Sequence, residues 1–383
     1  MSSQTTIVEP TGDQVAAIVD PLIQDNPQIG VAVGVVGGDF DDNGAIYYQG
    51  ALVNHAGDPL PLDESTSFEI ASVSKTFTAT LFALLGSRST DVWNGTLAQY
   101  QPSGTDPLYP DYGDLALRWL ATYTSGLPRD NSDPTDQPKP LPQPYTVADM
   151  YGYLSQERFP VDPQDTTYLY SNLGFALLGQ SMLAAAGKPA STYPALLTRD
   201  VLQPLGMTGT APIGAVPADQ MPLGFRADGS KAPIGWPQNP AYVPAGGLVS
   251  TPADVFTWLA FNMGLVDDAA LKPLLALTQT PQTTVKTLNG SQLGLGWFLS
   301  TMSTPGGTQP FVWKDGGLAG FSSYLAFLPS SDPGSAQSAG GVFVLTNSHI
   351  PSGRIALNVL RVMLGYPYVS GVDAAQLDTD RLI

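Results

Sequence analysis

The chain has 383 residues, of which 43% are hydrophobic, enough for one large or two moderate domains with a buried core. The chain has sixteen basic and thirty-three acidic residues. The resulting formal charge of −17 would repel nucleic-acid phosphates and anionic lipid surfaces. The absence of cysteine excludes disulfides, thiolate metal sites and a cysteine nucleophile. With no stretch of membrane-spanning length and no signal-peptide pattern in this numbering, we expect a soluble protein, either cytoplasmic or exported and processed.

The first predicted elements are an amphipathic helix over 11–25 and two strands over 30–38 and 45–53. The segment between the strands, from Asp39 to Gly44, matches the first half of a calcium loop. Gly50 stands where such a loop requires glutamate, and its flanks read as strands rather than helices. A hairpin turn is therefore predicted here.

The middle of the chain is predicted to be mostly helical. Helical patterns lie at 73–86, 114–122, 147–156, 172–186, 190–204 and 252–263. Their connections are rich in Pro, Gly and Asp, and the stretch 134–144 (PTDQPKPLPQP) is predicted to be an extended surface loop.

Strand patterns return after about residue 292, in LGLGWFLS, FVWKD, FSSYLAFLP and GGVFVLTNS, before a closing helix near 355–365. Strands at both ends with helices between them indicate one sheet built from distant segments. We therefore expect an α/β domain from 10–70 and 245–366, and a mostly helical domain from 71–244 that carries two of the motifs below.

A histidine-dependent serine hydrolase is not indicated. The chain has two histidines, His55 and His349, and no GxSxG motif. Both histidines are interpreted as structural or surface residues, and their scarcity also argues against a histidine-rich zinc site.

The segment S72-V-S-K75 at the start of an apolar helical run has two interpretations. In one, Ser72 caps a helix and Lys75 is a solvated charge in its first turn. In the other, Ser72 is a nucleophile and Lys75 its base, because residues three apart share a helix face and burial or nearby positive charge leaves part of a lysine neutral.

Two later motifs favour the second interpretation. They are Y170-S-N172 and K314-D-G316, each of which taken alone could be structural: a helix entry capped by Asn172, and a strand tail with its turn at 314–317. In order and separation, the three motifs resemble the SxxK, YxN and KTG elements of the serine β-lactamase and penicillin-binding protein superfamily. LATYTSGLP (120–128), PLGMTGT (204–210) and AGGLVSTPADV (245–255) also resemble segments of that family, and the likeness covers about 20–365. The types it resembles most are class C β-lactamases, D-Ala-D-Ala carboxypeptidases and family VIII carboxylesterases.

The resemblance implies an α/β (α+β) fold in which helices flank an antiparallel sheet beside a mostly helical domain. It implies that Ser72 forms an acyl-enzyme, with the proton transferred by Lys75 and Tyr170, and that no metal or organic cofactor takes part. Lys75 and Lys314 beside the phenol would favour the Tyr170 phenolate.

Further roles follow from the same resemblance. Asn172 would bind a substrate amide and orient Lys75. Lys314, Asp315 and Gly316 would line the substrate site, and the backbone N–H groups of Ser72 and Gly317 would form the oxyanion hole.

Two positions depart from the family pattern. Tyr123 replaces a common histidine, which we expect to affect packing more than chemistry. Asp315 replaces a threonine or serine that helps to bind the substrate carboxylate. A carboxylate there would partly neutralise Lys314 and repel anionic substrates, which favours esters, neutral amides or substrates with a free amine.

The predicted function is therefore serine acyl hydrolysis of β-lactam or D-amino-acid peptide amides, on a small-molecule or short-peptide substrate. The alternatives are a carboxylesterase or acyltransferase of the family VIII type and, from another class, a noncatalytic penicillin-binding receptor. The sequence predicts no particular oligomeric state.

Overall fold

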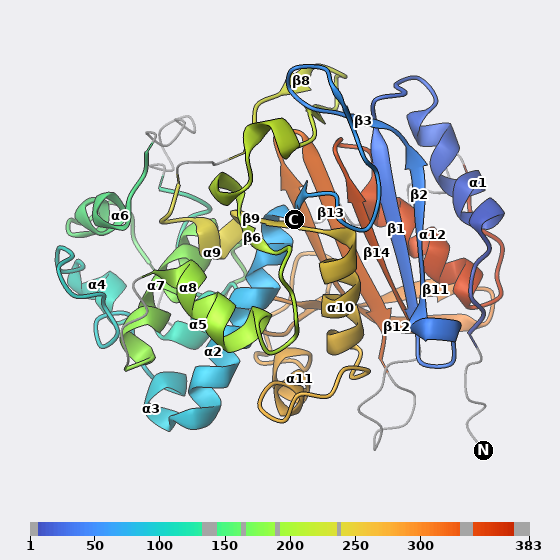
Figure 1. Cartoon of the computed structure of the whole chain (residues 1–383). Coiled ribbons are helices and arrows are strands. Elements are labelled where there is room, and N and C mark those ends of the chain that lie inside the picture. Colours follow the sequence, from blue (N-terminus) through green and yellow to red (C-terminus); the bar gives the residue numbers. More distant parts are fainter. Residues whose placement is uncertain are drawn as a thin grey trace.

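The computed structural model describes residues 7–131, 144–161, 166–187, 192–235, 239–329 and 340–370. All but the last residue of the predicted loop at 134–144 lies outside these ranges. In the described part, a seven-stranded sheet has the order β10-β11-β12-β13-β14-β1-β2, and every neighbouring pair is antiparallel (Figure 1). Its strands are β1 (Gly30–Gly37), β2 (Gly44–Gly50), β10 (Gln292–Leu293), β11 (Phe298–Thr304), β12 (Gly307–Leu318), β13 (Phe321–Leu328) and β14 (Gly340–Thr346).

The sheet joins the two ends of the chain, as predicted. Strand β1 is buried along its whole length and pairs with β14, with Val33 opposite Val344. It also pairs with β2 through a short 3₁₀ turn at Asp41–Asn43, so the predicted hairpin is confirmed. Gly44 ends this turn at φ 131°, and a Cβ atom there would lie 2.0 Å from the Val35 carbonyl oxygen, so the turn requires glycine.

Helices cover both faces of the sheet (Figure 1). On one face α12 (Ser352–Met363) packs against β13 and β14, and α1 (Gly12–Ile23) packs against β2 and α12. Thr11 begins α1 with a capping box that it shares with Gln14. On the other face α10 (Pro252–Asn262) packs against β1 and β14.

Helix α2 (Ser74–Arg88) is the central helix of the fold, and every residue from Ser74 to Gly86 is buried. Such a helix has no solvent-facing side on which polar groups could be hydrated. Its threonines instead donate to carbonyl oxygens of the preceding turn, as Thr76 does to Val73 at 2.8 Å. Trp258 of α10 stacks on Phe77 with ring centroids 3.9 Å apart, and its indole N–H donates to Thr76 Oγ1. Helix α2 is thereby fixed in place.

The remaining elements are short or lie beside α2. They are α3 (Thr90–Trp93), α4 (Pro110–Gly113), α5 (Leu117–Ala121), α6 (Val147–Leu154), α7 (Asn172–Ala185), α8 (Tyr193–Leu197), α9 (Val243–Gly246), α11 (Leu275–Thr278), β3 (Leu52–Val53), β4 (Pro59–Leu60), β5 (Phe68–Glu69), β6 (Ala211–Pro212), β7 (Gly224–Phe225), β8 (Lys231–Ala232) and β9 (Leu248–Ser250). The predicted fold class is confirmed, while the division into two domains stays a prediction.

Two predicted helices are shorter than expected. The pattern at 114–122 gives only α5, because Ala116 is extended and forms a β-bridge with Thr96. The pattern at 190–204 gives α8, with Pro194 in its first turn, and then one π-helical turn at Thr198–Leu202. Hydrophobic spacing did not distinguish a continuous helix from these local changes.

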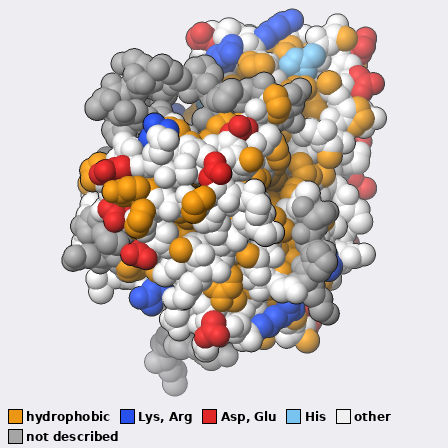
Figure 2. Space-filling model, turned by 90° about the vertical axis from the view of Figure 1, so that its left-hand side faces the viewer, with side chains coloured by type: hydrophobic (Ala, Val, Ile, Leu, Met, Phe, Trp, Pro, Cys, Tyr) orange, Lys and Arg blue, Asp and Glu red, His pale blue; other side chains and the backbone are white. Residues whose placement is uncertain are grey.

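Figure 2 shows the helical side of the molecule, where Lys and Arg side chains lie apart from one another among polar and hydrophobic ones. Among the described residues, no helix has both the length and the apolar character needed to cross a membrane.

Candidate active site

The 3₁₀ turn Ala71–Val73, immediately before α2, holds Ser72. The residue that caps α2 is Val73, and no side chain accepts a hydrogen bond at that cap. The capping interpretation of Ser72 is therefore wrong, and its hydroxyl is available for other contacts. Ala71 is buried at φ 46°, a left-handed conformation that is strained for alanine, so the backbone just before Ser72 is held in a strained turn. Ser72 is only half-buried.

Lys75 lies on the first turn of α2 and reaches back to Ser72, as its spacing predicted. Its Nζ atom is 3.0 Å from Ser72 Oγ, 2.7 Å from Asn172 Oδ1 and 2.5 Å from the Ala245 carbonyl oxygen. The side chain is fully buried. Three groups from different parts of the chain therefore converge on one amine.

Burial is the main reason that the pKa of Lys75 is well below its ordinary value, and the nearby Lys314 and Arg129 cations lower it further. Asp130 and Asp315 act in the opposite direction. The result is a lysine that is more easily deprotonated than one in water, as a general base requires.

Tyr170 precedes α7, is 6% exposed, and its phenol interacts with the Ser72 side chain. The predicted phenolate is wrong, because burial raises the pKa of the Tyr170 phenol, and Asp315 raises it further. Lys75 and Lys314 do lie near Tyr170, but over the face of its ring, 4.9 and 5.2 Å from the centroid. The raised pKa favours a neutral Tyr170 phenol in this site.

Asn172 is the first residue of α7, while Ser171 is the cap and accepts from Gly174 N. The interpretation of Asn172 as a helix cap is therefore wrong. Its side chain points instead to Lys75, and its Nδ2 donates to Asp130 Oδ1 at 3.0 Å.

The third motif lies inside β12, which continues to Leu318, so these residues are not a strand tail and turn. Lys314 is fully buried and donates to Asp315 Oδ1 at 2.7 Å and to the Asp315 carbonyl oxygen at 2.9 Å. The expected neutralisation of Lys314 by Asp315 is thus present as an ion pair. The Asp315 side chain is 20% exposed.

Gly316 brings β12 against the Ser72 turn. A Cβ atom at Gly316 would lie 2.4 Å from the Ile70 carbonyl oxygen and 3.0 Å from Ser72 N, so only glycine fits. Ser323, opposite Gly316 on β13, donates to the same Ile70 oxygen at 2.8 Å. Gly317 has more room, with the His349 ring 4.0 Å from its Cβ position. The sheet and the nucleophile turn are therefore in direct contact.

Sequence reasoning missed Arg129, Asp130 and Ala245 as site residues. The guanidinium of Arg129 lies 5.0 Å from the centre of the Tyr170 ring, and Asp130 holds Asn172. Arg129 and Asp130 directly follow the TSGLP segment, and Ala245 begins the AGGLV segment. The resemblance of these two segments to the family was therefore the signal that could have identified the three residues. Tyr123 stacks on Tyr170 at 5.0 Å, a packing role as expected.

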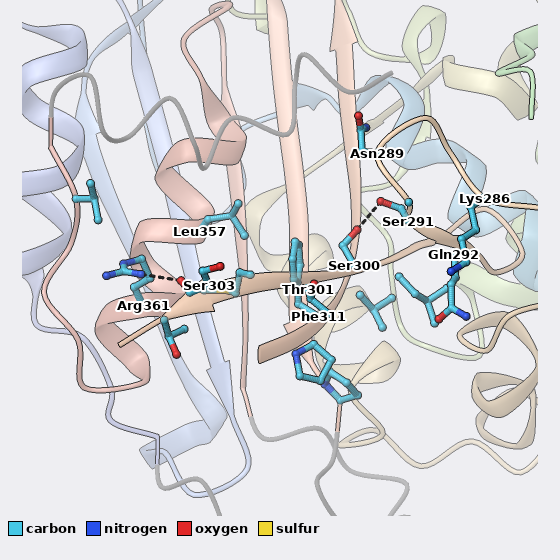
Figure 3. A pocket seen from close by; sticks show the side chains of 18 of the residues that line it. Lys286, Asn289, Ser291, Gln292, Ser300, Thr301, Ser303, Phe311, Leu357 and Arg361 are labelled. Carbon is cyan, nitrogen blue, oxygen red and sulfur yellow. Dashed lines mark hydrogen bonds between the residues drawn. The ribbon is translucent and has the colours of Figure 1, made fainter. Parts of the chain in front are cut away.

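A groove of about 940 Å³ lies elsewhere, along β11, β12 and α12 (Figure 3). It contains none of the predicted site residues. Two of its serine hydroxyls, Ser291 and Ser300, bond to each other at 2.7 Å, and Arg361 donates to the Ser303 carbonyl oxygen. No group of three or more His, Asp or Glu side chains able to hold a metal occurs within the described ranges.

Comparisons with known proteins show the family to which the chain belongs. The sequence model of the Beta-lactamase family matches residues 16–362. A beta-lactamase of Pseudomonas fluorescens is 28% identical, over 94% of this chain and 98% of its own. The D-alanyl-D-alanine-carboxypeptidase/endopeptidase AmpH of Escherichia coli K12 is 29% identical, over 69% of this chain and 68% of its own.

Solved structures show the same fold. A class C beta-lactamase superposes with a TM-score of 0.70 at 24% identity, over 91% of this chain and 95% of its own. The D-alanine carboxypeptidase AmpC of Burkholderia cenocepacia also gives 0.70 at 24% identity, over 91% and 98%. Because the family model covers nearly the whole chain, the chain belongs to the Beta-lactamase family of serine hydrolases.

Proposed function

We propose that the protein hydrolyses amide bonds of the β-lactam or D-amino-acid peptide type through an acyl-enzyme on Ser72. The observation that carries this proposal is the contact of Lys75 Nζ with Ser72 Oγ at 3.0 Å, by a fully buried amine whose pKa is lowered. The names of the relatives, beta-lactamase and D-alanyl-D-alanine-carboxypeptidase, support the substrate class.

In the proposed acylation step, neutral Lys75 takes the Ser72 proton as the Ser72 oxygen attacks the carbonyl carbon. Tyr170, as a neutral phenol beside Ser72, then donates its proton to the leaving nitrogen and is reprotonated from Lys75. The C–N bond breaks and the amine departs. Water hydrolyses the ester by the same groups in the deacylation step.

The developing oxyanion would be bound by the backbone N–H groups of Ser72 and Gly317, in keeping with the close approach of β12 to the nucleophile turn. Loss of one such donor typically costs ~3 kcal/mol in the transition state. Lys314, Asp315 and Gly316 would line the substrate site beside it. The second amide N–H of Asn172, beside the one that donates to Asp130, would bind a substrate amide.

The experiment is a comparison of kcat/KM for a chromogenic cephalosporin, a D-Ala-D-Ala peptide and p-nitrophenyl butyrate, with Ser72→Ala as control. We expect turnover of at least one of the two amide substrates that is lost in Ser72→Ala. Turnover of the ester alone would favour the carboxylesterase. A Ser72 adduct that forms with penicillin and persists would favour the receptor.

A further inference from the structure

The side-chain amide of Asn172 lies between the base and a carboxylate outside the three motifs. Its Oδ1 accepts from Lys75 Nζ at 2.7 Å, and its Nδ2 donates to Asp130 Oδ1 at 3.0 Å. Asn172 is 7% exposed, so water has little access to this amide. Asp130, Asn172, Lys75 and Ser72 therefore form one continuous chain of hydrogen bonds.

The orientation of the Asn172 amide decides which of its atoms faces Lys75, the proposed base. A carboxylate only accepts hydrogen bonds, whereas an amide has one end that accepts and one that donates. Facing Asp130, the Asn172 amide must present its NH₂ group to the carboxylate and its oxygen to Lys75. Turned the other way, it would present two N–H donors to the Lys75 amine and an oxygen to an oxygen.

The hydrogen-bond donors and acceptor of Lys75 can be assigned in the same way. A neutral amine has two N–H groups and one lone pair. The Asn172 oxygen and the Ala245 carbonyl oxygen, at 2.7 and 2.5 Å, only accept, so they take both N–H groups. The lone pair is then left for the third neighbour, Ser72 Oγ at 3.0 Å. In that arrangement the Ser72 hydroxyl donates to Lys75, which is the geometry of proton abstraction.

The two residues before Asp130 are hydrogen-bonded to the start of α7. The Arg129 carbonyl oxygen accepts from Asn172 N at 2.7 Å, and Ser171 Oγ donates to the Pro128 carbonyl oxygen at 2.7 Å. These bonds fasten the loop to the first turn of α7. The carboxylate of Asp130 and the amide of Asn172 are thus fixed relative to each other.

We propose that Asp130 is a positioning residue, whose carboxylate fixes the Asn172 amide with its oxygen toward Lys75 and so directs the Lys75 lone pair at Ser72. The inference rests on the proposed function, because it takes Lys75 as the base. It adds a residue that none of the three motifs contains.

The charge of Asp130 and its acceptor role can be separated. The charged groups that act on Lys75 are Lys314 and Asp315 from β12 and Arg129 and Asp130 from the loop that follows α5. Asp130→Asn keeps an amide oxygen that can accept from Asn172 but removes a charge that raises the pKa of Lys75. Asp130→Ala removes both the acceptor and the charge.

A matched control lies one residue further along the same loop. Asn131 accepts from the Tyr242 hydroxyl at 2.9 Å and donates to Tyr145, so Asn131→Ala loosens the loop at a different point. The measurement is the rate constant of Ser72 acylation by p-nitrophenyl butyrate, followed by intact mass against pH.

We expect Asp130→Ala to lower the plateau rate constant at least about tenfold. Asp130→Asn should keep the plateau within about threefold of the wild type and move the acid limb to lower pH, because Lys75 then loses its proton more easily. Asn131→Ala should change neither the plateau nor the limb, whatever it does to the melting temperature.

An unchanged plateau in Asp130→Ala, or an equal loss in Asn131→Ala, would overturn the positioning role. Absence of any wild-type adduct with both p-nitrophenyl butyrate and benzylpenicillin, together with equal hydrolysis by the wild type and Ser72→Ala, would instead remove the proposed function. A second readout does not depend on turnover: NMR titration of ¹³Cε-labelled lysine should give a lower Lys75 pKa in Asp130→Asn and an unchanged one in Asn131→Ala. A lowered Lys75 pKa in Asn131→Ala would contradict the inference, because the change would then follow from loosening the loop and not from Asp130.

Discussion

Asp315→Asn should make the site bind and turn over anionic substrates better. In the wild type, Asp315 Oδ1 lies 2.7 Å from Lys314 Nζ, and the Lys314 side chain is fully buried. A substrate carboxylate that approaches Lys314 therefore approaches Asp315 as well. Asparagine retains an oxygen that accepts from Lys314, so the perturbation removes the charge while keeping this contact.

The magnitude follows from the two opposing charges. At 4 Å and an effective dielectric of 20, each unit-charge interaction is worth ~4 kcal/mol, so attraction by Lys314 and repulsion by Asp315 nearly cancel. Asp315 is 20% exposed, so solvent and salt screen its charge. Taking half of the full repulsion leaves about 2 kcal/mol, which corresponds to about 30-fold in kcat/KM.

The assay is the ratio of kcat/KM for benzylpenicillin, which carries a carboxylate, to kcat/KM for the neutral p-nitrophenyl butyrate. The expected increase of this ratio in Asp315→Asn is about 30-fold. Asp111→Asn, on the exposed part of α4, makes the same change in net charge far from the motifs. A ratio that stays within about threefold of the wild type, or an equal rise in Asp111→Asn, would refute the reasoning.

Three further predictions each concern a single residue. Lys75→Arg, which remains charged at all accessible pH values, should slow Ser72 acylation at least about 100-fold, and an unchanged rate of adduct formation would exclude Lys75 as the base. Gly316→Ala should lower the melting temperature and prevent acylation, because its methyl group meets Ile70 O at 2.4 Å, whereas Gly317→Ala, with 4.0 Å to its nearest contact, should keep the melting temperature. Burial raises the pKa of Glu69 to about 7 from an ordinary 4.5, so the folded state binds the extra proton and stability should fall as pH rises through this window. That loss amounts to about 3 kcal/mol in the free energy of unfolding, and denaturant titrations of Glu69→Gln at pH 5 and pH 8 should show it removed, whereas an equal loss in the variant would contradict the assignment.

Much of the fold was predictable because hydrophobic patterns report directly on burial. The strand patterns at both ends of the chain correctly gave one sheet, since β1 is buried throughout and pairs with β14. The patterns could not predict where another local structure replaces a helix. Ala116 joins a β-bridge instead of a helix, and Pro194 lies in the first turn of α8.

The candidate site was also predictable only in part. The spacing of Ser72 and Lys75 predicted their contact, because both lie within one helical turn. The neutral Tyr170 was not predictable, because the outcome depends on whether nearby cations face its hydroxyl or its ring, and on how deeply the phenol is buried. Asp130 was missed for a related reason: the neighbouring TSGLP segment marks its place in the chain, but the contact of its carboxylate with Asn172 forms only in the folded structure.

The most direct test of the account is peptide mapping by mass spectrometry after reaction with p-nitrophenyl butyrate and with benzylpenicillin. In samples quenched with acid during the reaction, we expect an acyl group on Ser72 in the wild type, formed faster as pH rises, and none at that position in Ser72→Ala. Acylation of a different residue, or equal labelling of the wild type and Ser72→Ala, would contradict it.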